Sequence, residues 1–113
     1  MMKHILAAIG LLELTYPAQA QNVLPPLEYD HPYKGKLTVE RSTSQVEIRL
    51  NCPYSPFRYL LGCAKSPAEG ECYILMWDDE SLKKLRMPPE VVLRHETAHC
   101  NGWPADHRGG RWP

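Results

Sequence analysis

Residues 88–104 read PPEVVLRHETAHCNGWP, and this stretch decides how the chain is built. Two prolines and Glu90 open it, which is typical of a helix start, because proline suits the first turn and an acid favours the positive end of the helix dipole. Gly102 can adopt the left-handed conformation that ends a helix, and Pro104 prevents the helix from resuming. The sequence therefore predicts one helix that begins at the prolines and ends at Gly102.

This predicted helix has faces of different character. Polar residues recur at helical spacing on one face, at Arg94, Thr97 and Asn101. Another face carries apolar residues together with His95 and His99. We therefore expect the two histidines to point inward, toward the strands of the domain.

The sequence upstream of the helix predicts strands. Residues 37–39 and 46–50 alternate apolar and polar side chains on either side of residues 42–45, which indicates a hairpin with one buried face. Residues 72–77, CYILMW, form a continuous apolar run that is typical of a strand covered on both faces. A short amphipathic helical turn is expected over residues 81–87. The expected fold class is α+β, a small antiparallel sheet with a C-terminal helix.

The first part of the chain indicates export. Residues 1–20 contain Lys3, the apolar run ILAAIGLL and the triplet AQA at 18–20, which is the order of a secretory signal peptide with its cleavage site. The apolar run is too short to span a bilayer, so we expect no membrane association after the leader is removed. Residues 21–36 lack periodicity and predict an extended N-terminal arm, which leaves residues 37–113 as the domain. We expect an exported protein, either periplasmic or secreted.

The charge of the chain is balanced. It holds 13 basic and 13 acidic residues, and loss of Lys3 and Glu13 with the leader leaves 12 of each. Such a balance provides no electrostatic attraction to nucleic acid or to a membrane surface. We therefore expect neither of them as a partner.

The chain has 4 cysteines, an even number that predicts two disulfides in an exported protein. A domain of this size benefits from such links, because its hydrophobic core is thin. Of the three possible pairings we expect Cys63 with Cys72, across a short connection. Cys52 would then tether Cys100 on the predicted helix.

His95, Glu96 and His99 have the spacing of a metal site. Histidines four residues apart lie on one helix face, so both imidazoles can reach one ion. Zinc is the expected cofactor, because imidazole nitrogen is one of its preferred ligands. Glu96 follows the first ligand and places a carboxylate beside the ion without coordinating it. There it can act as a general base on zinc-bound water, which is the chemistry of hydrolysis.

Residues 95–102, HETAHCNG, resemble the H-E-x-x-H-x-x-G motif of the metzincin branch of the zincin metallopeptidases. The resemblance implies that His95 and His99 bind zinc, that Glu96 is the general base, and that the substrate is a peptide or protein. It covers about the last quarter of the chain. Ala105 occupies the place of the usual third ligand, and all methionines precede the motif, so no methionine turn follows it. The sequence thus predicts a small, divergent zincin-like domain.

The third zinc ligand is expected from the turn after Gly102, where residues 103–106 have proline at the second position. This turn can return either Asp106 or His107 to the ion, and adjacent residues of an extended segment point to opposite sides. We favour His107 as the ligand, with Asp106 as an acceptor that orients a ligand histidine. Asp106 as the third ligand is the alternative. His31 in the arm is a remote candidate, whose ordinary role is that of a solvated surface histidine.

The function expected from the sequence is an exported zinc-dependent hydrolase, a small metallopeptidase. The alternative is a non-catalytic, zinc-stabilised periplasmic binding or assembly module, which the small size of the domain favours. Four protein ligands would indicate this module, and three ligands with an open position would indicate the enzyme. A disulfide-stabilised inhibitor or adhesion domain without metal is a further possibility.

Overall fold

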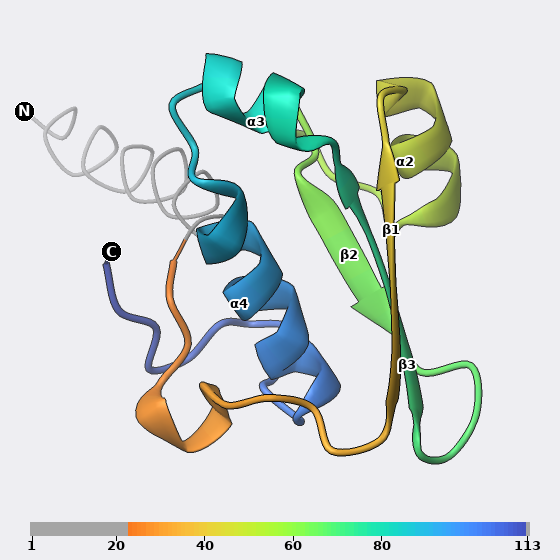
Figure 1. Ribbon diagram of the computed structural model, residues 1–113. Helices are drawn as coiled ribbons and strands as arrows, with labels where there is room; N and C mark the ends of the chain where they lie inside the picture. Colours follow the sequence, from red (N-terminus) through yellow and green to blue (C-terminus); the bar gives the residue numbers. More distant parts are fainter. Residues whose placement is uncertain (1–22, 113) are drawn as a thin grey trace, which may run out of the picture.

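The computed structural model describes residues 23–112, which form an α+β domain around a three-stranded mixed sheet (Figure 1). Its strands are β1 (Lys36–Ser42), β2 (Gly62–Lys65) and β3 (Glu71–Trp77), in the order β1-β3-β2. Strand β1 runs parallel to β3, and β2 runs antiparallel to it. The helical segments are the 3-10 turn η1 (Leu27–Tyr29) and the helices α2 (Gln45–Asn51), α3 (Asp79–Lys84) and α4 (Pro89–Cys100).

Strand β3 is the centre of both the sheet and the core, as its continuous apolar run predicts. Its side chains alternate between the two faces of the sheet. Ile74 and Met76 pack against Val92 of α4. Leu75, between them, packs against Ile48 of α2. Figure 1 shows the consequence: the sheet lies between α4 on one side and α2 on the other.

Residues 46–50 belong to helix α2, so the predicted hairpin is wrong. The Ser44 hydroxyl accepts a hydrogen bond from the Glu47 N–H at 3.0 Å, and the Ser42 hydroxyl donates to the Glu47 carboxylate. This Ser-x-x-Glu spacing marks a helix start, and it prevails over the alternating pattern of the same residues. Because the chain enters a helix here, β1 pairs with β3 in parallel. The sheet is therefore mixed and not antiparallel.

Helix α4 has the predicted bounds, from the prolines to the residues before Gly102. Helix α3 begins earlier than the predicted turn over residues 81–87. The carboxylate of Asp78 accepts a hydrogen bond from the Ser81 N–H at 3.3 Å and caps this earlier start.

The described part of the arm is folded against α4. Leu24 and Arg111 exchange two backbone hydrogen bonds, of 2.6 and 2.7 Å. The Asp30 carboxylate accepts hydrogen bonds from Arg94 and Arg111. The side-chain amide of Asn101 donates to two backbone carbonyls of the arm. The polar face of α4 therefore binds the arm, and the arm in turn binds the C-terminal tail.

Two disulfides are present, but they join Cys52 with Cys63 and Cys72 with Cys100, so the predicted pairing is wrong. The strand register gives the reason. Cys63 lies opposite Leu75, on the sheet face that α2 covers. Cys72, three residues before Leu75 along β3, points to the α4 face. Each strand cysteine is thus bonded to a cysteine at the end of the helix that covers its own face.

These disulfides are typical of a compartment outside the reducing cytoplasm. Among residues 23–112, no helix combines the length and the apolar composition that crossing a bilayer requires. The predicted signal peptide, residues 1–20, lies outside the described residues.

Candidate metal centre

The end of α4 turns the chain back toward the histidines of the same helix. Gly102 has a φ of 103°, and its N–H donates to the His99 carbonyl at 3.1 Å. The N–H of Trp103 donates to the Ala98 carbonyl at 3.0 Å. This pair of bonds is a Schellman motif, and the usual hydrophobic contact is present because Trp103 packs on Ala98. The cap thereby directs the tail toward the histidine face of the helix.

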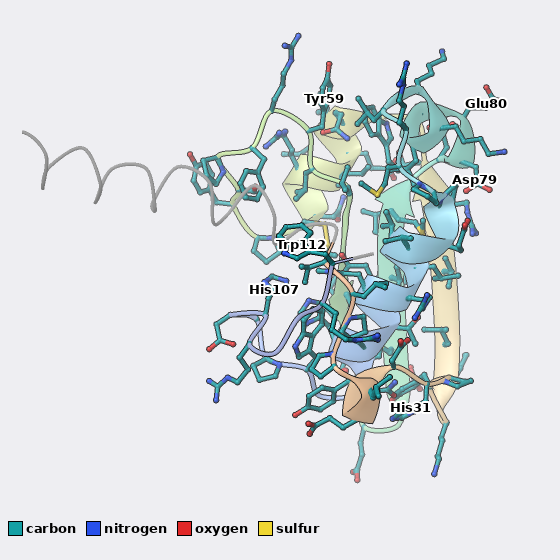
Figure 2. All side chains as sticks on the ribbon, turned by 90° about the vertical axis from the view of Figure 1, so that its left-hand side faces the viewer. His31, Tyr59, Asp79, Glu80, His107 and Trp112 are labelled. Atoms are coloured by element: carbon teal, nitrogen blue, oxygen red, sulfur yellow. A yellow bond between two sulfur atoms is a disulfide. The ribbon has the colours of Figure 1, made fainter. Side chains whose placement is uncertain are left out.

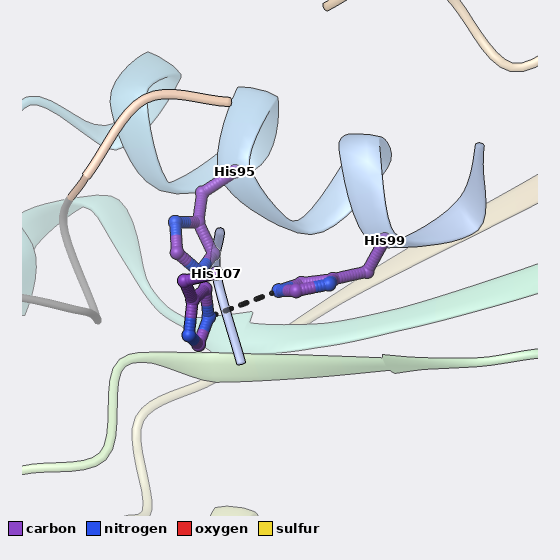
Figure 3. Close-up of side chains that lie close together, drawn as sticks. All are labelled: His95, His99 and His107. Atoms are coloured by element: carbon purple, nitrogen blue, oxygen red, sulfur yellow. Dashed lines mark hydrogen bonds between the residues drawn. The ribbon is translucent and has the colours of Figure 1, made fainter. Parts of the chain in front are cut away.

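Three imidazoles converge beside α4, those of His95, His99 and His107 (Figure 3). Nε2 of His107 lies 3.1 Å from Nε2 of His95 and 3.2 Å from Nε2 of His99. The ligand nitrogens of the cluster all lie within 4.8 Å of one another. Nitrogens bound to one tetrahedral zinc ion at about 2.0 Å are roughly 3.3 Å apart, so the cluster has the size of a metal site.

Backbone carbonyls fix both imidazoles of the helix. Nδ1 of His95 donates to the Val23 carbonyl at 2.7 Å, and Nδ1 of His99 donates to the Trp103 carbonyl at 2.8 Å. A carbonyl can only accept, so each Nδ1 carries the proton and each Nε2 presents a lone pair to His107. Nε2 of His107 can offer at most one proton to these two lone pairs, whereas one metal ion could bind all three nitrogens. This is the tautomer and orientation of metal-binding histidines, and the residues present fit a bound metal ion.

The histidines are in the neutral form that binds metals. The pKa of His95 is lowered to about 3, mainly by burial. The hydrogen bond to Val23 opposes this shift, and the neighbouring imidazoles of His99 and His107 add to it. Burial likewise lowers the pKa of His107 to about 4, with a contribution from His99. The pKa of His99 is lowered too, again by burial. At neutral pH the cluster therefore presents uncharged nitrogen donors.

Trp103 packs against every ring of the cluster. Its ring centroid lies 5.0 Å from that of His95, 4.9 Å from that of His99 and 5.0 Å from that of His107. The indole is 2% exposed, and its N–H donates to the Arg108 carbonyl at 2.9 Å. Trp103 therefore anchors the tail and positions the imidazoles at the same time.

Of the two residues expected to compete for the third position, the structure brings His107 to the cluster. The Asp106 carboxylate instead pairs with Arg108 at 2.9 Å, on a side chain that is 57% exposed. Backbone carbonyls are the acceptors for Nδ1 of His95 and Nδ1 of His99. His31 is exposed, its Nδ1 lies 3.0 Å from the Pro32 carbonyl, and Figure 2 shows it away from His107.

A cleft of about 500 Å³ borders the cluster, and Glu96 lines it together with the three histidines. Glu96 is 6% exposed, and burial raises the pKa of its carboxyl to about 8. Strand β2 and residues 52–57 supply another part of the lining. Residues 52–57 are not predicted to belong to the site, because the sequence marks them only by two prolines and by Cys52. Val23 is not predicted either, because it acts through a backbone carbonyl that every residue possesses.

The described residues thus place three nitrogen donors and one buried carboxyl on a common cleft, where the histidines could hold a metal ion. Comparison of the chain with protein-family models, curated proteins and solved structures gave no match. Its function therefore has to be inferred from the site itself.

Proposed function

We propose that this protein is an exported zinc-dependent hydrolase, a small peptidase that uses the HETAH helix in the zincin manner. The observation that carries the proposal is the convergence of three neutral imidazoles on a cleft that also contains Glu96. Three histidine ligands with an open position are typical of catalytic zinc sites, whereas structural sites have four protein ligands.

The donor set supports zinc as the metal. The cluster consists of imidazole nitrogens, and the described cysteines are all bonded in disulfides, so no thiolate competes for the ion. Imidazole suits zinc, and the two separations from Nε2 of His107, 3.1 and 3.2 Å, are close to those of a tetrahedral site. When bound, zinc supplies Lewis acidity, which acidifies water and polarises a substrate carbonyl.

Glu96 would supply the acid–base chemistry of peptide hydrolysis. Burial raises the pKa of Glu96 to about 8, and a zinc ion held beside it would lower that pKa and favour the carboxylate. The carboxylate could then take a proton from the attacking water as the water oxygen bonds to the carbonyl carbon. The same group then gives that proton to the amine nitrogen as the C–N bond breaks. His95, directly before Glu96 on α4, is held by Val23, so base and ligand share one rigid element.

The alternative is a zinc-stabilised binding or assembly module without catalysis. It requires a fourth protein ligand, and Asp106, the neighbour of His107, is instead paired with Arg108. The cleft that the cluster lines also favours the hydrolase, because it leaves room for a substrate beside the ligands.

Substitution Glu96→Gln tests the proposal. We expect the variant to bind one equivalent of zinc, and its hydrolysis of a quenched fluorescent peptide to fall by about 10²- to 10⁴-fold. Glu90→Gln, in the exposed first turn of the same helix, is the matched control and should retain both properties. Full activity in Glu96→Gln would exclude Glu96 as the base. A zinc-loaded parent protein that hydrolyses no peptide would favour the non-catalytic module.

A further inference from the structure

Residues 52–57, termed here the cleft wall, are held firmly although they form no helix or strand. The disulfide from Cys52 to Cys63 fixes their start to β2. The guanidinium of Arg49 donates hydrogen bonds to two carbonyls of this segment, those of Ser55 and Phe57, and to the carbonyl of Arg58 directly after it. Two prolines further restrict the segment. The cleft wall is therefore pre-organised and would lose little conformational freedom on binding a ligand.

The surface that the cleft wall offers is aromatic and uncharged. Tyr54 lines the cleft although its side chain is 90% exposed, and the half-buried Phe57 lines it beside Leu60. Among the lining residues in the described chain, Glu96 is the only acid, and there is no lysine or arginine. A charged side chain held against the cleft wall, whose residues carry no charge, would lose water without gaining an ionic partner there, which is unfavourable. An apolar side chain would instead gain contact with exposed aromatic rings.

The cleft also offers a way to bind the backbone of a peptide. Strand β2 is an edge strand of the sheet, and its residues Gly62, Cys63 and Ala64 line the cleft. An extended peptide can add to such an edge through main-chain hydrogen bonds, while pockets for its side chains give specificity. Because the same cleft reaches both Tyr54 and His107, a peptide bound along β2 would contact the cleft wall next to the histidines.

We propose that the cleft wall selects the substrate, by binding an apolar side chain of an extended peptide next to the bond that is cleaved. This inference rests on the proposed hydrolase function and adds the substrate class to it. Tyr54 and Phe57 are the specificity-determining residues. Peptides with acidic or basic side chains at this position are poor substrates.

The test uses the zinc-loaded full chain and three blocked, quenched fluorescent hexapeptides. Their central pair is Phe-Leu, Asp-Asp or Lys-Lys, flanked on each side by two alanines. We expect kcat/KM for the Phe-Leu peptide to exceed the other two values by at least about tenfold. Tyr54→Ser should lower kcat/KM for this peptide by about tenfold, mainly through KM, because an aromatic contact is lost. Tyr54→Lys should raise the relative rate with the Asp-Asp peptide.

Leu27→Ser is the matched control, because Leu27 is 76% exposed and does not line the cleft. Binding of the same labelled peptides to the zinc-loaded Glu96→Gln variant, measured by fluorescence anisotropy, separates the two proposals. Equal rates for the three peptides, or no effect of Tyr54→Ser, would overturn the role of the cleft wall and leave the hydrolase intact. If no peptide is hydrolysed but the Phe-Leu peptide binds, and Tyr54→Ser weakens that binding, catalysis would be overturned and the role of the cleft wall supported. If the peptides are neither hydrolysed nor bound, both proposals would be overturned.

Discussion

Gly102 and His107 both have left-handed backbones, with φ of 103° and 60°. Between them the chain leaves the helix and returns with the third imidazole. Histidine enters this conformation more readily than most residues with a side chain, but it still has a cost. The surrounding contacts offset that cost, above all the packing of Trp103 and the bonds of the Schellman motif.

Gly102→Ala should therefore destabilise the zinc-free protein by about 1–2 kcal/mol. The new Cβ would lie 3.8 Å from the Tyr29 ring, which is an ordinary contact, so the loss would come from the backbone conformation and not from a clash. Urea denaturation of the zinc-free protein measures this loss of stability. Gly102→Asn should cost less, because asparagine adopts the left-handed region more easily. Equal losses in both variants, or none, would contradict this account of the helix end.

The sequence could single out His95, Glu96 and His99, because a separation of four residues on a helix defines a common face. Helical spacing could not decide whether Asp106 or His107 is the third ligand candidate. This choice depends on the left-handed backbone at His107, which local sequence does not encode. The bond to Val23 was equally inaccessible, because the two residues are 72 positions apart.

Among the elements, α4 and α2 show when local signals suffice. Proline and glycine mark both ends of α4, and the predicted helix is the observed one. In α2 two signals compete, the alternation of residues 46–50 and the cap formed by Ser44 and Glu47. The cap prevails: the helix buries Ile48 against the sheet, while Val46 and Leu50 stay exposed, so the alternating residues do not share a buried face. The parallel pairing of β1 with β3 follows from this helix and could not be predicted without it.

Ser44→Ala should lower the free energy of unfolding by about 1 kcal/mol, because the Glu47 N–H loses its acceptor. Urea denaturation of the zinc-free protein is the measurement. Ser66→Ala provides the comparison, since Ser66 is exposed in the connection between β2 and β3 and caps no helix. If both substitutions had the same effect, the cap would not explain why α2 replaces the expected strand.

At the scale of the whole molecule, the histidine cluster joins segments that are distant in the sequence. Val23 in the arm orients one imidazole of the cluster, α4 carries two of the histidines, and the tail carries His107. Arg111 binds the arm through Leu24 and Asp30, so tail and arm are also joined directly. The order of the elements could be read from the sequence in large part. The links between them could not, because ion pairs and disulfides depend on strand register and on faces that appear after folding.

The link at Asp30 predicts a defined pH dependence. Hydrogen bonds from Arg94 lower the pKa of Asp30 below its ordinary value of 3.8. The positive charges of Arg94 and Arg111 lower this pKa as well. Its contribution to stability is therefore complete above pH 3.8 and disappears as the pH falls through the lowered pKa of the folded state. Asp30→Asn should cost about 1.5–3 kcal/mol at neutral pH and progressively less as the pH falls below 3.8, in urea denaturation of the zinc-free protein.

Asp79→Asn is the control for this measurement. The ion pair of Asp79 with Arg41 is solvent-exposed, with side chains 49% and 42% exposed, and should contribute less than about 1 kcal/mol. A cost of Asp30→Asn that stayed constant from neutral to acidic pH would show that the charge of Asp30 does not hold the arm.

The most direct test of the metal centre is the zinc content of the purified protein, measured by elemental mass spectrometry together with His107→Ala and Asp106→Ala. We expect one equivalent of zinc in the parent and in Asp106→Ala, and its loss from His107→Ala at low free zinc. No bound metal in the parent, even after refolding with zinc, would contradict the three-histidine site, and with it the proposed hydrolase.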